Sequence, residues 1–273
     1  MRPPRHRSWG CFVLCNDSST TSHHFTISEG GTGVNPEIRI LDDEDTRLAE
    51  AWATLSPQLE ALGPQAVLAW ATKQFPEGLV LASSFGAEDM VLIDMLTRVT
   101  DHPVVFYLDT GLLFPETYTL IRQVEARYPL RLVRVAPALS IEEQGERLGP
   151  ALWSRNPDQC CAIRKVEPLQ RYLADKRAWI TGIRRDQTPF RKNAPVVGFD
   201  ERHGLVKINP LAPWSQKDVF RYLVKNQVPY NPLHDHGYPS IGCVPCTRPV
   251  NPGDDPRAGR WAGQEKTECG LHL

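Results

Sequence analysis

Short apolar runs alternate with stretches of helical periodicity along most of the chain. From Glu44 to Trp70 apolar residues recur every three or four positions, which is the period of one helix face. The apolar runs are too short for helices, so we expect them to be buried strands. The expected strands are Leu79–Ser83, Pro103–Leu108, Arg131–Val135, Ala178–Gly182 and Leu205–Ile208, and the expected helices are Glu44–Trp70, Glu88–Leu96, Pro115–Tyr128, Cys161–Leu173 and Gln216–Asn226.

This alternation predicts an α/β fold, in which helices cover both faces of a twisted parallel sheet. After Val228 the sequence is rich in Pro and Gly and has little periodicity, which predicts a loop-rich C-terminal tail. We therefore expect a disordered extension (1–43), an α/β domain (44–235) and the tail (236–273). Ligands of such sheets bind beyond the carboxyl ends of the strands, so candidate site residues are sought there.

Composition excludes several classes of protein. The 273 residues carry a formal net charge of −1, so there is no basic excess for nucleic acid. No apolar run approaches the roughly 18 residues of a membrane span. The basic start around Cys11 and Cys15 lacks a signal-peptide cleavage site, and it is either a start-site artefact or a targeting segment. We expect a cytoplasmic protein, in which clustered cysteines indicate a metal or catalysis rather than disulfides.

The first expected strand ends in a loop that is suited to an anion. Small hydroxyl residues and a glycine let backbone N–H groups approach an anion, and the following helix N-terminus adds a favourable dipole. The loop is neither a Walker loop nor a dinucleotide fingerprint. An ordinary turn with a Ser cap explains it equally well. The candidate residues are Ser83, Ser84, Phe85, Gly86, Glu88 and Asp89.

Two further strands end in polar or small residues at the same edge of the sheet. The alternatives are helix capping by the Asp and Thr, and a solvated surface pair for the two arginines. Three strand ends that converge on one edge nevertheless favour a nucleotide pocket. The candidate residues are Leu108, Asp109, Thr110 and Gly111 after the second strand, and Gly182, Arg184 and Arg185 after the fourth.

Four cysteines have the pattern of ligands for one metal centre. Cys160 and Cys161 are adjacent, and Cys243 and Cys246 form a knuckle of the kind that binds zinc or an iron–sulfur cluster. Neighbouring side chains at the start of a helix diverge by about 100°, which favours a wide cluster over a compact ion. Four thiolates meet the ligand count of a [4Fe–4S] cluster, with a structural zinc site as the alternative.

Two charged residues flank the cysteine pair. We expect Asp158 to cap the helix, whose N-terminal dipole favours thiolates. Lys165 lies about one turn beyond Cys161 and can face the same side. There it would couple the metal centre to an anionic substrate, whereas the alternative is a surface lysine.

Cys269 stands apart from the other cysteines, on a tail with a following glycine. Lys266 and His272 are cationic neighbours of the kind that lower the pKa of a thiol. Arg257 and Arg260 are spaced to hold an oxyanion. We therefore predict that Cys269 is a nucleophile and that Lys165, Arg257, Arg260 and His272 are its catalytic partners, whereas the alternative is an incidental cysteine of the tail.

Together these motifs resemble the assimilatory adenylyl-sulfate reductases, relatives of the phosphoadenylyl-sulfate reductases. The resemblance covers roughly residues 79–273, and it is specific because the double cysteine, the knuckle and the tail occur in this order. Its motifs are the Ser83–Asp89 loop, Leu108–Gly111, Cys160-Cys161-x-x-Arg164-Lys165, Gly182-x-Arg184-Arg185-Asp186-Gln187, Cys243-x-x-Cys246, Arg257-x-x-Arg260-Trp261 and Lys266-Thr-Glu-Cys269-Gly-Leu-His272.

The resemblance implies an adenine-nucleotide fold related to the ATP pyrophosphatases. It also implies one [4Fe–4S] cluster per chain on the four paired cysteines, not thought to pass electrons. The implied enzyme is an oxidoreductase that acts on a sulfur group with a disulfide as acceptor. Members with the cluster usually reduce adenosine 5′-phosphosulfate, in sulfate assimilation and cysteine biosynthesis. No thioredoxin-like domain follows His272, so a separate thioredoxin or glutaredoxin is the expected reductant.

Under this resemblance, the substrate phosphate lies on the Ser83–Gly86 loop and the Cys269 thiolate attacks the sulfate sulfur. AMP leaves, an S-sulfocysteine remains, and thioredoxin releases sulfite from it. Three alternatives differ in substrate or in class. They are reduction of the 3′-phosphorylated substrate, tRNA thiolation by an ATP-pyrophosphatase-type enzyme, and a non-catalytic zinc-stabilised nucleotide sensor.

Overall fold

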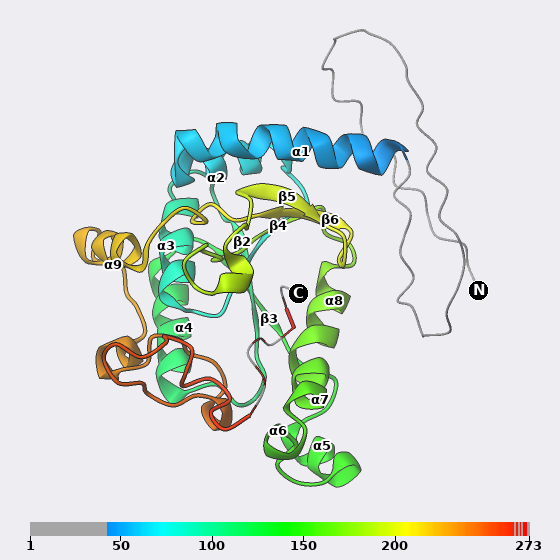
Figure 1. Cartoon of the computed structure of the whole chain (residues 1–273), viewed down its shortest axis with the longest axis vertical. Coiled ribbons are helices and arrows are strands. Elements are labelled where there is room, and N and C mark those ends of the chain that lie inside the picture. Colours follow the sequence, from blue (N-terminus) through cyan, green and yellow to red (C-terminus); the bar gives the residue numbers. More distant parts are fainter. Residues whose placement is uncertain (1–42, 265, 267, 269, 272–273) are drawn as a thin grey trace, which may run out of the picture. The chain divides into compact units, whose positions relative to one another are not determined.

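Six strands form one sheet in the order β3-β2-β1-β4-β6-β5 (Figure 1). The computed structural model describes residues 43–264, 266, 268, 270 and 271. The expected 1–43 extension therefore lies outside the described residues, except for Asp43, where α1 begins. The parallel strands are β1 (Leu79–Ser83), β2 (Val104–Leu108), β3 (Arg131–Val135), β4 (Ala178–Ile180) and β6 (Leu205–Ile208), and β5 (Val197–Asp200) is antiparallel to β6.

Alternate residues of the strands contribute to two apolar layers, as the two-residue period of a strand requires. On one face Leu81 of β1 and Val105 of β2 belong to the larger layer. On the other face their neighbours Val80 and Phe106 pack with Leu169 of α8. Both faces are covered, so the expected α/β fold is confirmed, with an antiparallel edge strand added. The larger layer includes residues of α2 (Pro64–Gln74), α3 (Ala87–Leu96), α4 (Pro115–Arg127) and α9 (Gln216–Lys225), and the smaller layer includes residues of α8 (Glu167–Leu173).

The other helical elements are mostly short. Ser140 and Glu143 form a capping box at the start of α5, as Ser215 and Asp218 do at the start of α9. No helix in the described part of the chain is long and apolar enough to cross a bilayer. The helical elements outside the two apolar layers' main helices are α1 (Asp43–Leu62), α5 (Ile141–Leu148), α6 (Leu152–Arg155), α7 (Pro157–Cys161), the π-helix η1 (Ala162–Val166), and the 3₁₀ turns η2 (Pro189–Arg191), η3 (Pro232–His236) and η4 (Val244–Cys246).

Some elements differ from the sequence-based expectation. The expected helix Glu44–Trp70 is two helices, because Gly63 adopts a left-handed φ of 80° and Pro64 begins α2. The expected helix Cys161–Leu173 instead begins at Pro157 and passes through a π-helical turn. The polar helix α5 and the edge strand β5 were not expected. Each lacks an extended apolar pattern.

Candidate functional site

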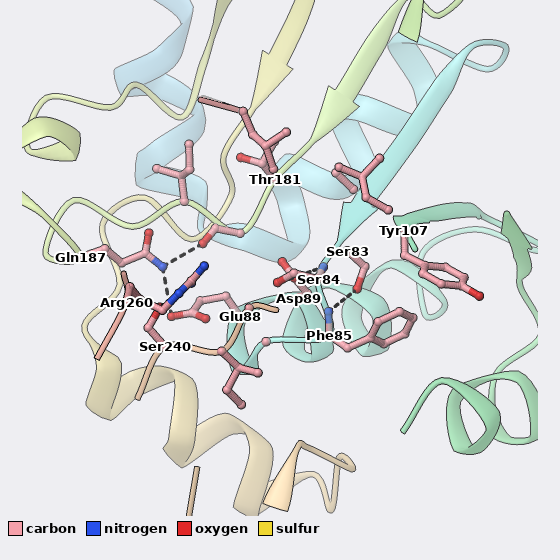
Figure 2. A pocket seen from close by; sticks show the side chains of 18 of the residues that line it. Ser83, Ser84, Phe85, Glu88, Asp89, Tyr107, Thr181, Gln187, Ser240 and Arg260 are labelled. Carbon is pink, nitrogen blue, oxygen red and sulfur yellow. Dashed lines mark hydrogen bonds between the residues drawn. The ribbon is translucent and has the colours of Figure 1, made fainter. Parts of the chain in front are cut away.

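A cavity of about 270 Å³ lies where β1, β2 and β4 end. Figure 2 shows part of its lining, with Ser83 and Ser84 from the end of β1 close to Asp89 of α3. The cavity brings together residues from all three predicted strand ends and from the C-terminal tail. The predicted residues that line it are Ser83, Ser84, Phe85, Gly86, Glu88, Asp89, Leu108, Thr110, Gly182, Arg184, Lys165, Arg257 and Arg260.

The loop after β1 is organised around the carboxylate of Asp89. Ser84 donates to Asp89 Oδ2 from its backbone N–H at 2.6 Å and from its hydroxyl at 2.8 Å. The N–H of Phe85 donates to Ser83 Oγ at 3.0 Å, with Phe85 in the left-handed region at φ 59°. Two of the loop donors that we expected to face an anion therefore bind side chains of the loop. The N-terminus of α3, which follows Gly86, supplies the favourable dipole for an anion.

Asp89 is buried, and its protonation is shifted by that burial. Removal from water raises the pKa of its carboxyl from 3.8 to about 6, against the hydrogen bonds from Ser84, which lower it. The nearby Glu88 carboxylate raises it further. The folded protein therefore holds this proton more tightly than the unfolded chain does.

This shift predicts a pH-dependent stability difference between the parent protein and Asp89→Asn. Because the folded pKa is raised, the contribution of Asp89 is most favourable near pH 4 and is lost as the pH rises through about 6. We expect the parent to lose about 2–3 kcal/mol relative to the variant between pH 4 and pH 7. Urea unfolding at several pH values measures this difference, with Asp101→Asn on an exposed loop as the control. A difference that does not change with pH would contradict the assignment.

Buried Arg184 and half-buried Glu88 form an ion pair at one wall of the cavity. Arg184 Nε lies 2.9 Å from Glu88 Oε1, and the Arg184 side chain is only 6% exposed. Arg184 also pairs with Asp186. Gly182, between β4 and this arginine, has no room for a side chain, because a Cβ atom there would lie 2.5 Å from Asp89 Oδ1.

Three of the predicted substrate residues do not line the cavity. Arg185 forms a two-pronged ion pair with Glu60 of α1, at 2.8 and 2.6 Å. Asp109 accepts hydrogen bonds from Tyr118 and Arg134, and these bonds outweigh burial and lower the pKa of its carboxyl. Gly111 donates its N–H to Asp109 and continues the turn at φ 71°. Both Asp109 and Gly111 thus shape the loop after β2, but Asp109 does not cap α4, whose N-cap is Phe114 without a side-chain hydrogen bond.

The four paired cysteines surround a small second cavity beside the first. Cys160 and Cys161 end α7, while Cys243 pairs with Leu113 in a β-bridge and approaches Thr110 Oγ1 at 3.3 Å. Burial raises the pKa of the Cys160 thiol to about 11, and the three neighbouring cysteines add to the effect. The structure therefore brings four cysteine side chains together from two distant parts of the chain.

The cysteine geometry bears on which metal group fits. Within the described ranges, no three Cys, His, Asp or Glu side chains are positioned to hold a single metal ion. In a tetrahedral zinc site all thiolates lie about 2.3 Å from one ion and hence close to each other. In a [4Fe–4S] cluster each thiolate binds a different iron, so the thiolates lie further apart. Cys160, Cys161 and Cys243 are buried and Cys246 is half-buried around one cavity, and these four thiols match the ligand count of such a cluster.

The residues around the cysteine pair differ in part from expectation. The helix cap is Asn156, whose side chain accepts from the N–H of Gln159, and Asp158 instead pairs with Lys266 of the tail. Lys165 lines both cavities, so it faces the side that we expected. Arg164 is buried and donates to the carbonyl of Thr110, which links the helix of the cysteine pair to the loop after β2.

The cationic residues of the tail gather around the buried ring of Trp261. The Arg260 guanidinium lies 4.6 Å, the Lys266 ammonium 5.5 Å and the Arg257 guanidinium 5.9 Å from the ring centroid. Cations over an aromatic face are attracted by its quadrupole. Trp261 itself lines the second cavity, and Arg257 and Arg260 line the first, so these cations lie close to both the cysteines and the strand ends. The predicted nucleophile Cys269 and its partner His272 lie outside the described residues.

Gln187, Arg191 and Glu268 are among the cavity-lining residues that sequence reasoning missed. Gln187 bridges Gly182 and Glu88 (Figure 2), and Arg191 pairs with Glu268. Gln187 was part of a recognised motif but had no assigned role. Arg191 and Glu268 are 77 positions apart, so no local pattern relates them.

The fold and the site define an α/β protein of the adenine-nucleotide alpha-hydrolase-like fold, with its cavity at the ends of the strands. The phosphoadenosine phosphosulfate reductase domain matches residues 78–249, more than half of the chain. The chain therefore belongs to the phosphoadenosine phosphosulfate reductase family.

Relatives in this family carry two different names. A Gloeobacter violaceus protein called phosphoadenosine 5′-phosphosulfate reductase is 54% identical over 221 residues, which are 80% of this chain and 92% of the relative. A Salinibacter ruber protein called adenosine 5′-phosphosulfate reductase is 49% identical over 221 residues, which are 81% and 88%. The phosphoadenylyl-sulfate reductase of Candida auris, solved as a phosphate complex, is 36% identical with a TM-score of 0.64, over 77% of this chain and 98% of that one. Yeast FAD synthetase, solved with FAD, is 15% identical with a TM-score of 0.53 over 79% of this chain and 71% of that one, and shares the fold alone.

Proposed function

We propose that the protein reduces adenosine 5′-phosphosulfate to sulfite and AMP, with thioredoxin or glutaredoxin as the electron donor, in the sulfate assimilation of the cytoplasm. The observation that carries the proposal is the composition of one cavity. The N-terminus of α3, five lysine and arginine side chains and Glu268, which precedes Cys269 in sequence, share this space. The 49% identical relative called adenosine 5′-phosphosulfate reductase supports the choice of substrate.

The proposed reaction begins with attack of the Cys269 thiolate on the sulfate sulfur. A bond forms between Sγ and this sulfur, the bond from sulfur to the phosphate oxygen breaks, and AMP leaves with the electron pair. Lys165, Arg257 and Arg260 line the cavity, where they offset the repulsion between two anions and stabilise charge on the departing phosphate. An S-sulfocysteine remains on Cys269.

A thiol reductant completes the cycle. Its first thiolate attacks Cys269 Sγ, and sulfite leaves with the electrons of the broken sulfur–sulfur bond. Its second thiolate closes its own disulfide and returns Cys269 as a thiolate. The reductant loses two electrons and the substrate sulfur gains two, so no other redox partner is needed.

The group that we propose at the second cavity is a [4Fe–4S] cluster held by Cys160, Cys161, Cys243 and Cys246. When bound, the cluster supplies a compact charge and a rigid link between its four ligands. Lys165 lines both cavities, so its ammonium group is placed to respond to the charge of the thiolates on one side and of the substrate on the other. Thr110 and Arg164 orient Cys243 and the helix of the cysteine pair.

The experiment that tests the function is anaerobic purification followed by a sulfite assay with adenosine 5′-phosphosulfate and reduced thioredoxin. Iron and sulfide are counted on the same sample. We expect sulfite together with about four iron atoms per chain. Zinc in place of iron, without turnover, would contradict both the cluster and the reaction.

A second candidate is reduction of the 3′-phosphorylated substrate. It is favoured by the name of the 54% identical relative, phosphoadenosine 5′-phosphosulfate reductase. The same assay with both nucleotides at equal concentrations decides between them. A higher kcat/KM for the 3′-phosphorylated nucleotide would replace the first choice of substrate without changing the proposed chemistry.

A further inference from the structure

The carboxylate of Glu268 lies between two guanidinium groups at the wall of the larger cavity. Glu268 Oε2 is 3.0 Å from Arg191 Nη2 and 3.1 Å from Arg257 Nη2. The three side chains are 11%, 12% and 18% exposed, so the ion pairs are largely shielded from water. Removing one member of such a buried group leaves charge uncompensated, which is strongly unfavourable. The carboxylate is therefore a firm attachment point for the end of the chain.

A chain of hydrogen bonds connects this attachment point to α3. Arg191 Nη1 donates to Gln187 Oε1 at 2.6 Å, and Gln187 Nε2 donates to Glu88 Oε1 at 3.2 Å. Glu88 lies in the first turn of α3, directly after the loop that closes on Asp89. Figure 2 shows the Gln187 amide next to the Glu88 carboxylate at one side of the cavity. The end of the chain is thus coupled to the element that would bind the substrate anion.

The other tail contacts are attached to different parts of the molecule. Lys266 pairs with Asp158 of α7, and Arg202 donates to the carbonyl of Gly270 at 2.5 Å. Leu271 packs against the smaller apolar layer and also lines the cavity. Among the described tail residues 266, 268, 270 and 271, Glu268 is the one whose hydrogen bonds and ion pairs lead to α3. It is also the immediate neighbour of Cys269 in sequence.

We propose that Glu268 is a positioning residue, which seats the C-terminal segment at the cavity through Arg191 and Arg257 and ties that seating to α3 through Gln187. Because Glu268 has two arginine partners, one of them can bind the substrate while the other keeps its ion pair with the carboxylate. An anionic sulfate can attract Arg257 while Arg191 keeps its hold on Glu268. The segment then stays at the cavity during the step that needs the nucleophile close to the sulfate. This part of the proposal rests on the function proposed above.

The test is Glu268→Gln, which keeps the shape of the side chain and removes its charge. We expect kcat for sulfite formation to fall by about 10- to 100-fold with KM changed by less than about threefold, since positioning acts on the reacting state. We also expect the rate of Cys269 alkylation by iodoacetamide, mapped by mass spectrometry without substrate, to change by at least about fivefold. Glu146→Gln, on the exposed face of α5, is the matched control and should match the parent in both assays.

A double-mutant cycle makes the outcome decisive. If Glu268 acts through Arg191, the fold-loss in kcat of the double variant Arg191→Met, Glu268→Gln should be no more than about twice the fold-loss of the worse single variant. The proposal would be overturned by fold-losses in kcat that multiply in the double variant, by a rise in KM alone, or by an unchanged rate of alkylation. The alkylation assay needs no turnover, so it still reports on Glu268 if the parent protein makes no sulfite. In that case the proposed function fails while the positioning role is judged separately.

Discussion

Cys269→Ser should bind adenosine 5′-phosphosulfate and release no sulfite, a loss of at least about 10³-fold in turnover. A serine hydroxyl does not ionise near neutral pH and cannot form the S-sulfocysteine. The groups that line the cavity are unchanged by this substitution, so the dissociation constant of the nucleotide should stay within about threefold of the parent value. Sulfite release with reduced thioredoxin and equilibrium dialysis with labelled nucleotide measure the two quantities.

The control for this variant is the double substitution Cys11→Ser and Cys15→Ser. These two cysteines belong to no motif, and turnover should be that of the parent. A second measurement follows the intermediate directly. With substrate present and thioredoxin omitted, the parent protein should carry a sulfonate on Cys269 that mass spectrometry detects and that Cys269→Ser lacks. Normal turnover in Cys269→Ser would end the proposed mechanism.

Most strands could be predicted because they are short and mostly apolar runs, including β3, which lies at an edge of the sheet and carries two arginines. The expected and observed bounds of Leu79–Ser83, Arg131–Val135 and Leu205–Ile208 are the same. The edge strand Val197–Asp200 could not be predicted, because it is short and contains a glycine and an acidic residue. Its position comes from antiparallel pairing with β6, which is a property of the folded sheet.

The site shows where local sequence stops being informative. Arg184 and Arg185 are adjacent and chemically identical, yet Arg184 lines the cavity and Arg185 binds Glu60, 125 positions away. Which of the two faces the cavity depends on this distant partner. The loop after β1 was recognised by its small residues, but its attachment to Asp89 depends on the burial of that carboxylate. Motifs predicted which segments meet, and tertiary contacts decide which atoms are exposed to a ligand.

Gly182→Ala should abolish most of the activity while the fold is kept. The added Cβ would lie 2.5 Å from Asp89 Oδ1 and 2.9 Å from Glu88 Cβ. Asp89 is buried and held by Ser84, so it cannot move aside as an exposed side chain would. The substitution therefore pushes the start of α3 away from β4, and a displacement of about 1 Å costs about 10² in rate. We expect kcat/KM to fall by at least about 100-fold, with a stability loss of about 1–3 kcal/mol.

The matched control is Gly145→Ala in α5. A Cβ atom there meets nothing within 4 Å, so the substitution removes the conformational freedom of a helical glycine without a clash. It should leave activity unchanged and stabilise the protein by about 0.5–1 kcal/mol. Urea unfolding and the sulfite assay on both variants separate a local effect on the site from general destabilisation. Full activity in Gly182→Ala would mean that α3 can move away from β4 without loss, and that its N-terminus does not hold the substrate anion.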